Sequence, residues 1–179
     1  MKIKVMFIFA IALSLSLSAR AQKSVKDYLD ELKSAGFPDV RAVSFAATKK
    51  GLAMTTLFKN EDRKTGINYL AETYPAKDEL NIVFKAFVPC ELTDDTKMLR
   101  ERIIMISDQK VVAYYGCAKE PGGSETKEIY LIKSTEGRDF AIRQFSEKNY
   151  VFVNLNGLPI PFHTEGFSEL IAKIGGKAL

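Results

Sequence analysis

Histidine and cysteine are the residue types of this chain that could carry chemistry, and both are scarce. The sequence holds one histidine, His163, and two cysteines, Cys90 and Cys117. Histidine is the commonest general base near neutral pH, so a proton-transfer or nucleophilic mechanism would have to recruit His163. No G-x-S-x-G turn accompanies it, and it lies between an apolar stretch and the start of a predicted helix. We predict a structural or surface histidine here, with a catalytic role as the alternative.

Two pairs of adjacent carboxylates are further candidates for acid–base chemistry. Glu61 with Asp62, and Asp94 with Asp95, could serve glycoside hydrolysis if the fold positioned them. Both pairs fall in charged, turn-like stretches, which favours solvated loops or helix caps. No glycine-rich turn opens a helix, and no spacing typical of a zinc or calcium site occurs. The sequence therefore predicts no catalytic, cofactor or metal site.

The two cysteines predict a disulfide. Cys90 and Cys117 are too far apart for a redox C-x-x-C, and no Cys/His pair completes a zinc site. In an exported protein the pair would meet an oxidising compartment. Closing a loop of this length would stabilise the fold by about 3 kcal/mol in the chain-entropy model. Two separate buried thiols are the alternative.

The first 21 residues have the parts of a secretory signal peptide. Two lysines precede an apolar stretch over residues 5–17, and Ala19 and Ala21 form an A-x-A cleavage site. The apolar run is shorter than a membrane-spanning helix needs, although an uncleaved anchor is the alternative. We expect cleavage after Ala21, a secreted or periplasmic location, no transmembrane anchor in the mature chain, and one β-rich globular domain over residues 22–179.

Signal cleavage also changes the charge of the protein. The chain has 26 basic and 22 acidic residues, and three of the basic ones are Lys2, Lys4 and Arg20. The net charge therefore falls from +4 to about +1 on cleavage. The remaining lysines and arginines alternate with acidic residues, and nucleic-acid binding needs a clustered basic face. We expect no nucleic-acid partner.

Apolar periodicity predicts an amphipathic helix at each end of the domain. After Ser24 and again after Thr164, apolar side chains recur with the i, i+3, i+4, i+7 spacing of one helix face. They are Val25, Tyr28, Leu29 and Leu32 in the first helix, and Phe167, Leu170, Ile171 and Ile174 in the second. The apolar face of each helix is expected to pack onto the core.

Between the helices, short β-branched and aromatic runs separated by turn residues predict an antiparallel meander of about eight to ten strands. The expected strands are Arg41–Thr48, Leu52–Phe58, Ile67–Tyr74, Leu80–Val88, Arg100–Ile106, Val111–Cys117, Lys127–Lys133, Phe140–Phe145, Tyr150–Asn154 and Leu158–Phe162. Asn156-Gly157 is the strongest hairpin turn signal. A short helical turn is expected at Thr93–Lys97.

Several of these strands are apolar on both faces, which bears on the architecture. Val111–Tyr115, Ile129–Ile132 and Tyr150–Val153 show no polar alternation, so both faces should be covered. The terminal helices can cover one face, and the other can fold against itself. We therefore expect an α+β domain with a strongly curved antiparallel sheet, barrel-like or sandwich-like.

The leading functional hypothesis is an exported, non-enzymatic binding protein that encloses a small apolar ligand in its curved sheet. The abundance of Phe and Tyr motivates it, and the candidate cavity or patch aromatics are Phe84, Tyr115, Tyr130 and Phe152. The alternative is a cell-envelope module that binds a protein partner, as an inhibitor, adhesion or assembly subunit, through exposed aromatics such as Tyr69, Tyr74 and Tyr115. An enzyme that uses His163 is the second alternative. A small outer-membrane barrel is disfavoured by the C-terminal helix.

Overall fold

The computed structural model describes residues 25–37, 39–47, 51–58, 67–76, 79–93, 99–119, 122–123 and 125–174. The predicted signal segment, both carboxylate pairs and most of the expected turn at Thr93–Lys97 lie outside them. The described chain forms, in order, α1 (Val25–Ser34), β1 (Val40–Ala47), β2 (Leu52–Phe58), β3 (Ile67–Ala76), β4 (Glu79–Ala86), β5 (Arg100–Ile106), β6 (Gln109–Lys119), β7 (Thr126–Ile132), α3 (Thr135–Glu147), β8 (Tyr150–Leu155), β9 (Leu158–His163) and α4 (Phe167–Ile174).

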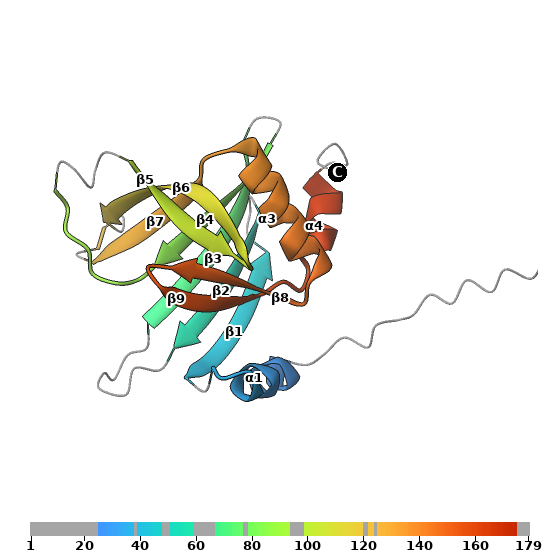
Figure 1. Ribbon diagram of the computed structural model, residues 1–179. Coiled ribbons are helices and arrows are strands. Elements are labelled where there is room, and N and C mark those ends of the chain that lie inside the picture. The colour runs from blue at the N-terminus through green and yellow to red at the C-terminus, as the bar shows by residue number, and fades with distance from the viewer. Residues whose placement is uncertain are drawn as a thin grey trace, which may run out of the picture.

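The nine strands form one antiparallel sheet that curves into a nearly closed barrel (Figure 1). Their order is β1-β2-β3-β4-β7-β6-β5-β8-β9. Strands that follow one another in sequence pair antiparallel within β1–β4, within β5–β7 and in β8–β9, whereas β4 pairs with β7 and β5 pairs with β8 across longer connections. This confirms the expected α+β class with a curved antiparallel sheet. The longer connections place the chain's last hairpin, β8–β9, beside β5.

Strand β9 lies at one edge of the sheet. Its prolines explain why no ladder of backbone hydrogen bonds joins this edge to another strand where the barrel closes. Pro159 and Pro161 alternate along β9, and proline has no N–H to donate to a neighbouring strand. Instead, the hydroxyl of Thr56 in β2 donates a hydrogen bond to the carbonyl oxygen of Pro161. A side-chain contact thus joins β9 to the opposite part of the sheet.

The expected strand over Phe140–Phe145 is wrong, because this segment belongs to the helix α3. Ser134 has extended backbone, and its Oγ accepts a hydrogen bond from the N–H of Gly137 at 3.0 Å, which caps the helix. The helix buries Ala141, Ile142 and Phe145 on one face. The segment Ser134–Gly137, which would be a hairpin turn between the two expected strands, is therefore the cap and first turn of a helix.

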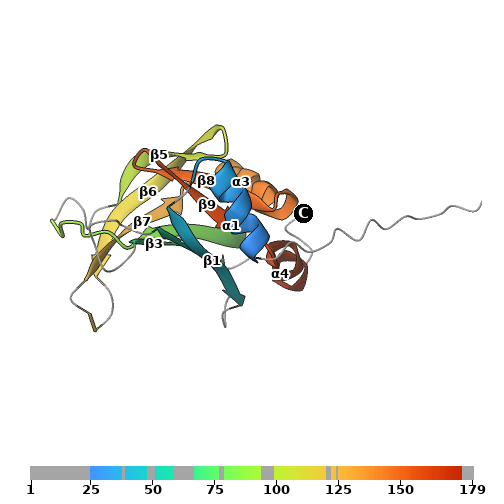
Figure 2. The ribbon, with the colours of Figure 1, turned by 90° about the horizontal axis from the view of Figure 1, so that it is seen from below.

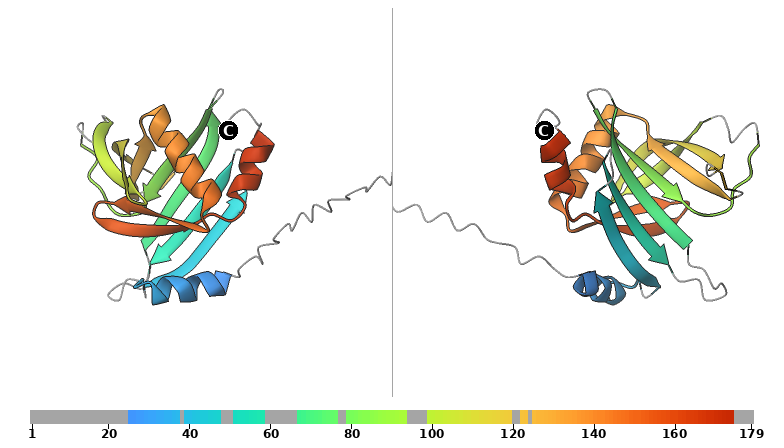
Figure 3. Two further views of the ribbon diagram at one scale, coloured as in Figure 1. Left: turned by 45° about the vertical axis from the view of Figure 1, so that its right-hand side comes forward. Right: turned by 180° about the vertical axis from the view of Figure 1, so that it is seen from behind.

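Helices α3 and α4 close one end of the barrel (Figure 3). Phe145 of α3 is 1% exposed, and its ring lies 5.4 Å from that of Phe167 in α4. Between the strands, Phe84 and Phe162 lie 6.3 and 6.5 Å from the Phe145 ring, respectively. Both helices contribute to the same hydrophobic cluster as the inward side chains of the sheet. The predicted C-terminal helix is confirmed, and it packs on the core as expected.

Helix α1, also predicted, packs elsewhere, against the outer side of the barrel next to β1 and the β8–β9 hairpin (Figure 2). Its Leu32 is 2% exposed and forms a second hydrophobic cluster with Val40 and Val43. The partly buried Phe37 and Phe152 pack against this cluster. Helix α1 therefore packs beside the sheet and does not contribute to the main core.

The predicted disulfide is confirmed. Cys90, in the segment after β4, is bonded to Cys117 of β6, with their Cα atoms 6.0 Å apart. The same segment is held by Thr126 of β7, whose hydroxyl accepts from the N–H of Cys90 at 3.0 Å and donates to its carbonyl at 2.9 Å. The connection from β4 toward β5 is thus fastened to β6 and β7. Among the described helices, none is long and apolar enough to cross a membrane.

Candidate functional site

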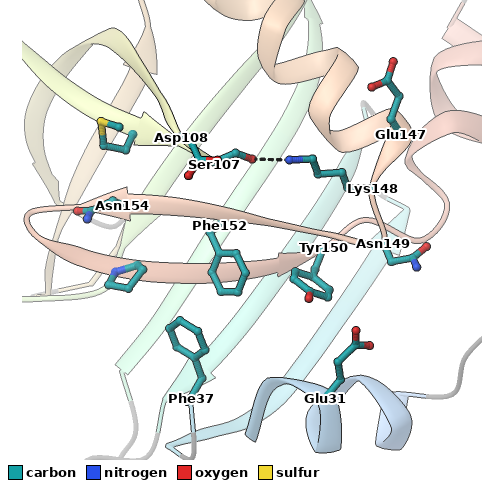
Figure 4. A pocket seen from close by; sticks show the side chains of 12 residues that line it. Glu31, Phe37, Ser107, Asp108, Glu147, Lys148, Asn149, Tyr150, Phe152 and Asn154 are labelled. Atoms are coloured by element: carbon teal, nitrogen blue, oxygen red, sulfur yellow. Dashed lines mark hydrogen bonds between the residues drawn. The ribbon is translucent and has the colours of Figure 1, made fainter. Parts of the chain in front are cut away.

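A groove of about 770 Å³ lies on the outer face of the β8–β9 hairpin (Figure 4). Its floor is formed by alternate residues of β8, with Pro159 of β9 beside them. Glu31 of α1 and Phe37 form one wall, and the β5–β6 turn with the end of α3 forms the other. The full lining is Glu31, Phe37, Met105, Ser107, Asp108, Glu147, Lys148, Asn149, Tyr150, Phe152, Asn154 and Pro159.

Aromatic rings cover the middle of the groove. Phe152 stacks on Phe37 with ring centroids 4.9 Å apart, and Tyr150 meets Phe152 edge-on at 5.3 Å. All three side chains are only partly buried. In β8, Tyr150, Phe152 and Asn154 face the groove, while Val151 and Val153 between them are fully buried. The strand is apolar on both faces because one face belongs to the core and the other to the groove.

A network of hydrogen bonds fixes the wall opposite α1. Ser107, at the β5–β6 turn, has a left-handed backbone (φ 53°), and its N–H donates to the carbonyl of Phe152 at 2.7 Å. Its hydroxyl donates to Oε1 of Gln144 in α3 at 3.0 Å and accepts from Nζ of Lys148 at 3.1 Å. Hydrogen bonds therefore join the β5–β6 turn to β8 and to the end of α3, and they fix the position of this wall of the groove.

The charged residues around the groove are mostly acidic. Glu31, Asp108 and Glu147 are lining residues, against the single ammonium group of Lys148. Glu31 points from α1 toward the hairpin, and Lys148 points to Ser107 (Figure 4). Acidic groups therefore outnumber basic groups among the residues that line the groove.

Tyr115 and Tyr130 lie inside the barrel, away from the groove, and converge on one carboxylate. Their hydroxyls donate to Oε1 and Oε2 of Glu128 at 3.1 and 2.8 Å. Asn156, at the tip of the β8–β9 hairpin, also donates to Oε2 at 2.8 Å. The guanidinium of Arg102 lies 4.2 Å from the Tyr115 ring centroid and donates to the side-chain oxygen of Asn156 at 3.3 Å. These contacts join β5, β6, β7 and the hairpin tip.

This tyrosine–glutamate cluster is a structural network with altered proton affinities. Burial, together with the hydrogen bond to Glu128 and its charge, raises the pKa of Tyr130 far above its ordinary value. Burial first, and then the charge of Glu128, also raises the pKa of Tyr69 and Tyr115. The three phenols therefore stay protonated at neutral pH and act as hydrogen-bond donors or apolar packing.

The four aromatics singled out from the sequence do not gather in one place. Phe84 is fully buried in the main core, and Tyr115 and Tyr130 belong to the glutamate network. Phe152 alone lines the groove. Tyr69 and Tyr115, expected as part of an exposed patch, are 6% and 7% exposed, so that expectation is wrong for both. The side chain of Tyr74 lies outside the described residues.

His163, the candidate base, is buried at the end of β9 and does not line the groove. It is 2% exposed, and its ring meets Tyr28 of α1 edge-on at 4.0 Å between centroids. Oε2 of Glu165 lies 3.8 Å from its Nε2. Burial lowers the pKa of the imidazole from its ordinary value. The structure thus places His163 between the sheet and α1, where it packs as a neutral ring.

The buried imidazole predicts a loss of stability in mild acid. Because the pKa of His163 is lowered in the folded state, the unfolded state binds the proton more readily. We expect the free energy of unfolding to decrease as the pH falls below about 6.5 and to level off below the folded-state pKa. The protein has only one histidine, so a single imidazole signal in an NMR titration reports this pKa.

Two variants complete the test of His163. His163→Gln should remove this part of the pH dependence while leaving that of the carboxylates. Glu165→Gln should lower the imidazole pKa further, because the neighbouring carboxylate favours the charged ring. An imidazole pKa at or above 6.5 in the folded wild type would contradict the expectation.

Comparison of the chain with protein-family models, with curated proteins and with solved structures found no match. No group of three or more metal-ligating side chains occurs within the described part of the chain. The sequence pointed to Phe152 but not to Phe37, Ser107 and Lys148, which belong to no motif and lie between the predicted helices and strands. They come together through contacts between segments far apart in the chain.

Proposed function

We propose that the protein is an exported, non-enzymatic binding protein whose ligand lies in the groove over the β8–β9 hairpin. The observation that carries the proposal is the row of partly exposed aromatic rings in a groove of about 770 Å³, a size in the range of small-molecule sites. The disulfide and the signal-like first 21 residues support export.

The groove supports a binding site better than the barrel interior does. Large side chains fill the space between the strands, including Phe84, Phe145 and Phe162, each at most 1% exposed. Protein cores packed in this way leave little room for a ligand. A ligand in the groove would instead contact Tyr150 and Phe152, whose rings are already exposed in part.

The lining predicts a ligand with an apolar body and a positive charge. The aromatic rings bind apolar or planar groups, and the surplus of carboxylates over Lys148 attracts an ammonium or guanidinium group. Such a ligand can be a small organic amine or a basic side chain of a peptide. Both offer the same chemistry to the groove.

A matched pair of probes tests this proposal. 1-Naphthylmethylamine and 1-naphthoic acid share an aromatic body and differ in charge, and binding of each is followed by NMR shifts of the Phe152 and Tyr150 resonances. We expect the amine to bind about ten times more tightly than the acid. Phe152→Leu, which keeps an apolar side chain but removes the ring, should weaken binding of the amine by about tenfold.

The charge and the location have their own controls. The double variant Glu31→Gln/Asp108→Asn should reduce the preference for the amine by about threefold to tenfold, because exposed charges each contribute up to about 1 kcal/mol. Phe140→Leu, which removes a half-buried ring on α3 outside the groove, should leave binding unchanged. Equal binding of both probes, or no effect of Phe152→Leu, would refute the proposal.

A further inference from the structure

The one histidine of the sequence lies under helix α1, on the same face of the β8–β9 hairpin as the floor of the groove. His163 pairs with Tyr150 across the hairpin, and residues directly opposite each other in an antiparallel pair point to the same side. Tyr150 lines the groove, whereas the imidazole is packed against the ring of Tyr28 in α1. Tyr28 is 7% exposed and His163 2%, so the docked helix shields the imidazole from water.

Titratable side chains face the imidazole from three elements. They are Tyr28 of α1, Tyr150 of β8 and Glu165 of the connection between β9 and α4. Strand β2, which packs against β9, has no ionisable side chain, and that of Arg41 in β1 lies outside the described residues. Because Glu165 belongs to the chain that follows β9, it remains beside the imidazole whether or not α1 is docked. Removal of α1 therefore changes the hydration of the ring more than the charges next to it.

Helix α1 is attached to the barrel by a small set of buried side chains. Of its described side chains, only Tyr28 and Leu32 are buried. Leu32 packs with Val40 and Val43 in a cluster separate from the main core, which contains no residue of α1. Segments held by few buried apolar contacts open at a lower free energy than the whole fold. The helix can therefore leave the barrel while the main core stays packed.

Phe37 is tied to the end of α1 and would leave the groove with it. The N–H of Phe37 donates a hydrogen bond to the carbonyl oxygen of Leu32 at 2.9 Å. The N–H of Gly36, which has a φ of 92°, donates to the carbonyl oxygen of Lys33 at 3.2 Å. This pair of hydrogen bonds is a local cap of the helix C-terminus. Since Phe37 and Glu31 both line the groove, release of α1 removes one of its walls.

We infer that protonation of His163 releases helix α1 from the barrel and opens the ligand groove on that side. In the docked state the imidazolium would be held away from water under Tyr28, and burial of a charge is costly. In the released state the same imidazolium is hydrated and keeps Glu165 nearby. The inference rests on the proposed function only in what the open groove does to a ligand.

The direction of the pH dependence follows from the burial of the ring. Burial lowers the pKa of His163 in the docked state, so the released state binds the proton more readily. The ratio of released to docked protein therefore rises as the pH falls below about 6.5, and it stops rising below the docked-state pKa. Between pH 7 and pH 5 the rise is at most about 25-fold, the limit set by an ordinary imidazole pKa of about 6.5 in the released state.

Hydrogen exchange of the mature, ligand-free protein tests the release of α1. The exchange is followed by NMR and corrected for the intrinsic rate at each pH. From pH 7 to pH 5, the protection factors of the α1 amides should fall at least threefold and at most about 25-fold. They should level off at the pH at which the His163 imidazole titrates. At pH 5 they should be at least tenfold lower than those of Ile142 and Phe145 in α3, which report global unfolding.

Two variants assign the pH dependence to the imidazole. His163→Gln should keep the protection of α1 nearly constant between pH 7 and pH 5. Asp30→Asn, which removes an exposed carboxylate from the same helix, is the matched control and should behave like the wild type. If His163→Gln itself loosens α1, the wild-type exchange curve still decides, because it must level off where the imidazole titrates.

Three results would overturn the inference. They are a wild-type α1 protection that does not change with pH, a decrease in His163→Gln as large as in the wild type, and equal protection of α1 and α3 at pH 5. The last result would mean that α1 leaves the barrel only when the whole protein unfolds.

1-Naphthylmethylamine links the helix to the groove. At ten times its dissociation constant, a ligand that needs α1 docked should raise the protection of α1 at pH 5 about tenfold. If the amine binds and the protection of α1 is unchanged, the groove does not depend on α1 and the inferred opening is wrong. If the amine does not bind at all, the proposed function fails, while exchange in the ligand-free protein still decides whether His163 controls α1.

Discussion

Phe145→Ala is expected to lower the free energy of unfolding by about 3–5 kcal/mol, the usual cost of removing a fully buried phenylalanine. The ring is 1% exposed and lies within 6.5 Å of Phe84, Phe162 and Phe167. It therefore joins two strands and α4 to α3, and the cavity left by alanine would adjoin all of them. The end of the barrel that α3 and α4 close should lose most of its packing.

Urea denaturation followed by far-UV circular dichroism measures this effect. Phe145→Leu should cost less than Phe145→Ala, because leucine fills part of the space. Arg143→Ala, an exposed change on the same helix, is expected to alter stability by less than about 0.5 kcal/mol. If Phe145→Ala changed stability no more than Arg143→Ala, α3 could not be the closure of the core described above.

Removing the disulfide should cost about 3 kcal/mol. Cys90 and Cys117 are separated by 27 positions, and closing a loop of this length restricts the unfolded chain. The bond also holds the segment after β4 to β6, next to the two hydrogen bonds between Cys90 and Thr126. We expect Cys90→Ala/Cys117→Ala to fold, with a lower denaturation midpoint.

Reduction of the wild type provides the complementary measurement. Dithiothreitol should lower the denaturation midpoint of the wild type toward that of the double variant and should leave the double variant unchanged. Thr126→Val, which removes the hydroxyl but keeps the volume, should cost a further 0.5–1.5 kcal/mol or so, because Cys90 loses two hydrogen bonds. A double variant as stable as the oxidised wild type would show that the bond does not stabilise the fold.

Hairpins were the most predictable part of this fold, because turn chemistry acts over a few residues. Asn156 and Gly157 have positive φ values of 53° and 85°, the conformation that favours Asn-Gly between paired strands. The start of helix α3 at Ser134–Gly137 was not predicted, because serine and glycine suit a turn as well as a helix start. Only the burial of Ala141, Ile142 and Phe145 against the end of the barrel decides for the helix.

Of the residues that line the candidate site, the sequence predicted only Phe152. Phe152 lies in the doubly apolar segment Tyr150–Val153 and, of the four aromatic residues proposed for a ligand site, it alone lines the groove. Tyr115 and Tyr130 lie in strands that are also apolar on both faces, and both are buried in the main core. The pattern shows that both faces of a strand are apolar, but not whether the second face meets a helix, a groove or solvent.

The sequence by itself determined the α+β class, the two terminal helices, most of the hairpins and the Cys90–Cys117 pairing, since these follow from local periodicity, turn residues and cysteine number. Tertiary structure decided the strand order, the place of α3, and the surfaces left for a partner. The groove needs α1, the β5–β6 turn and the β8–β9 hairpin side by side, although more than 100 positions separate Glu31 from Phe152. Such contacts arise from packing between distant segments, which no local pattern encodes.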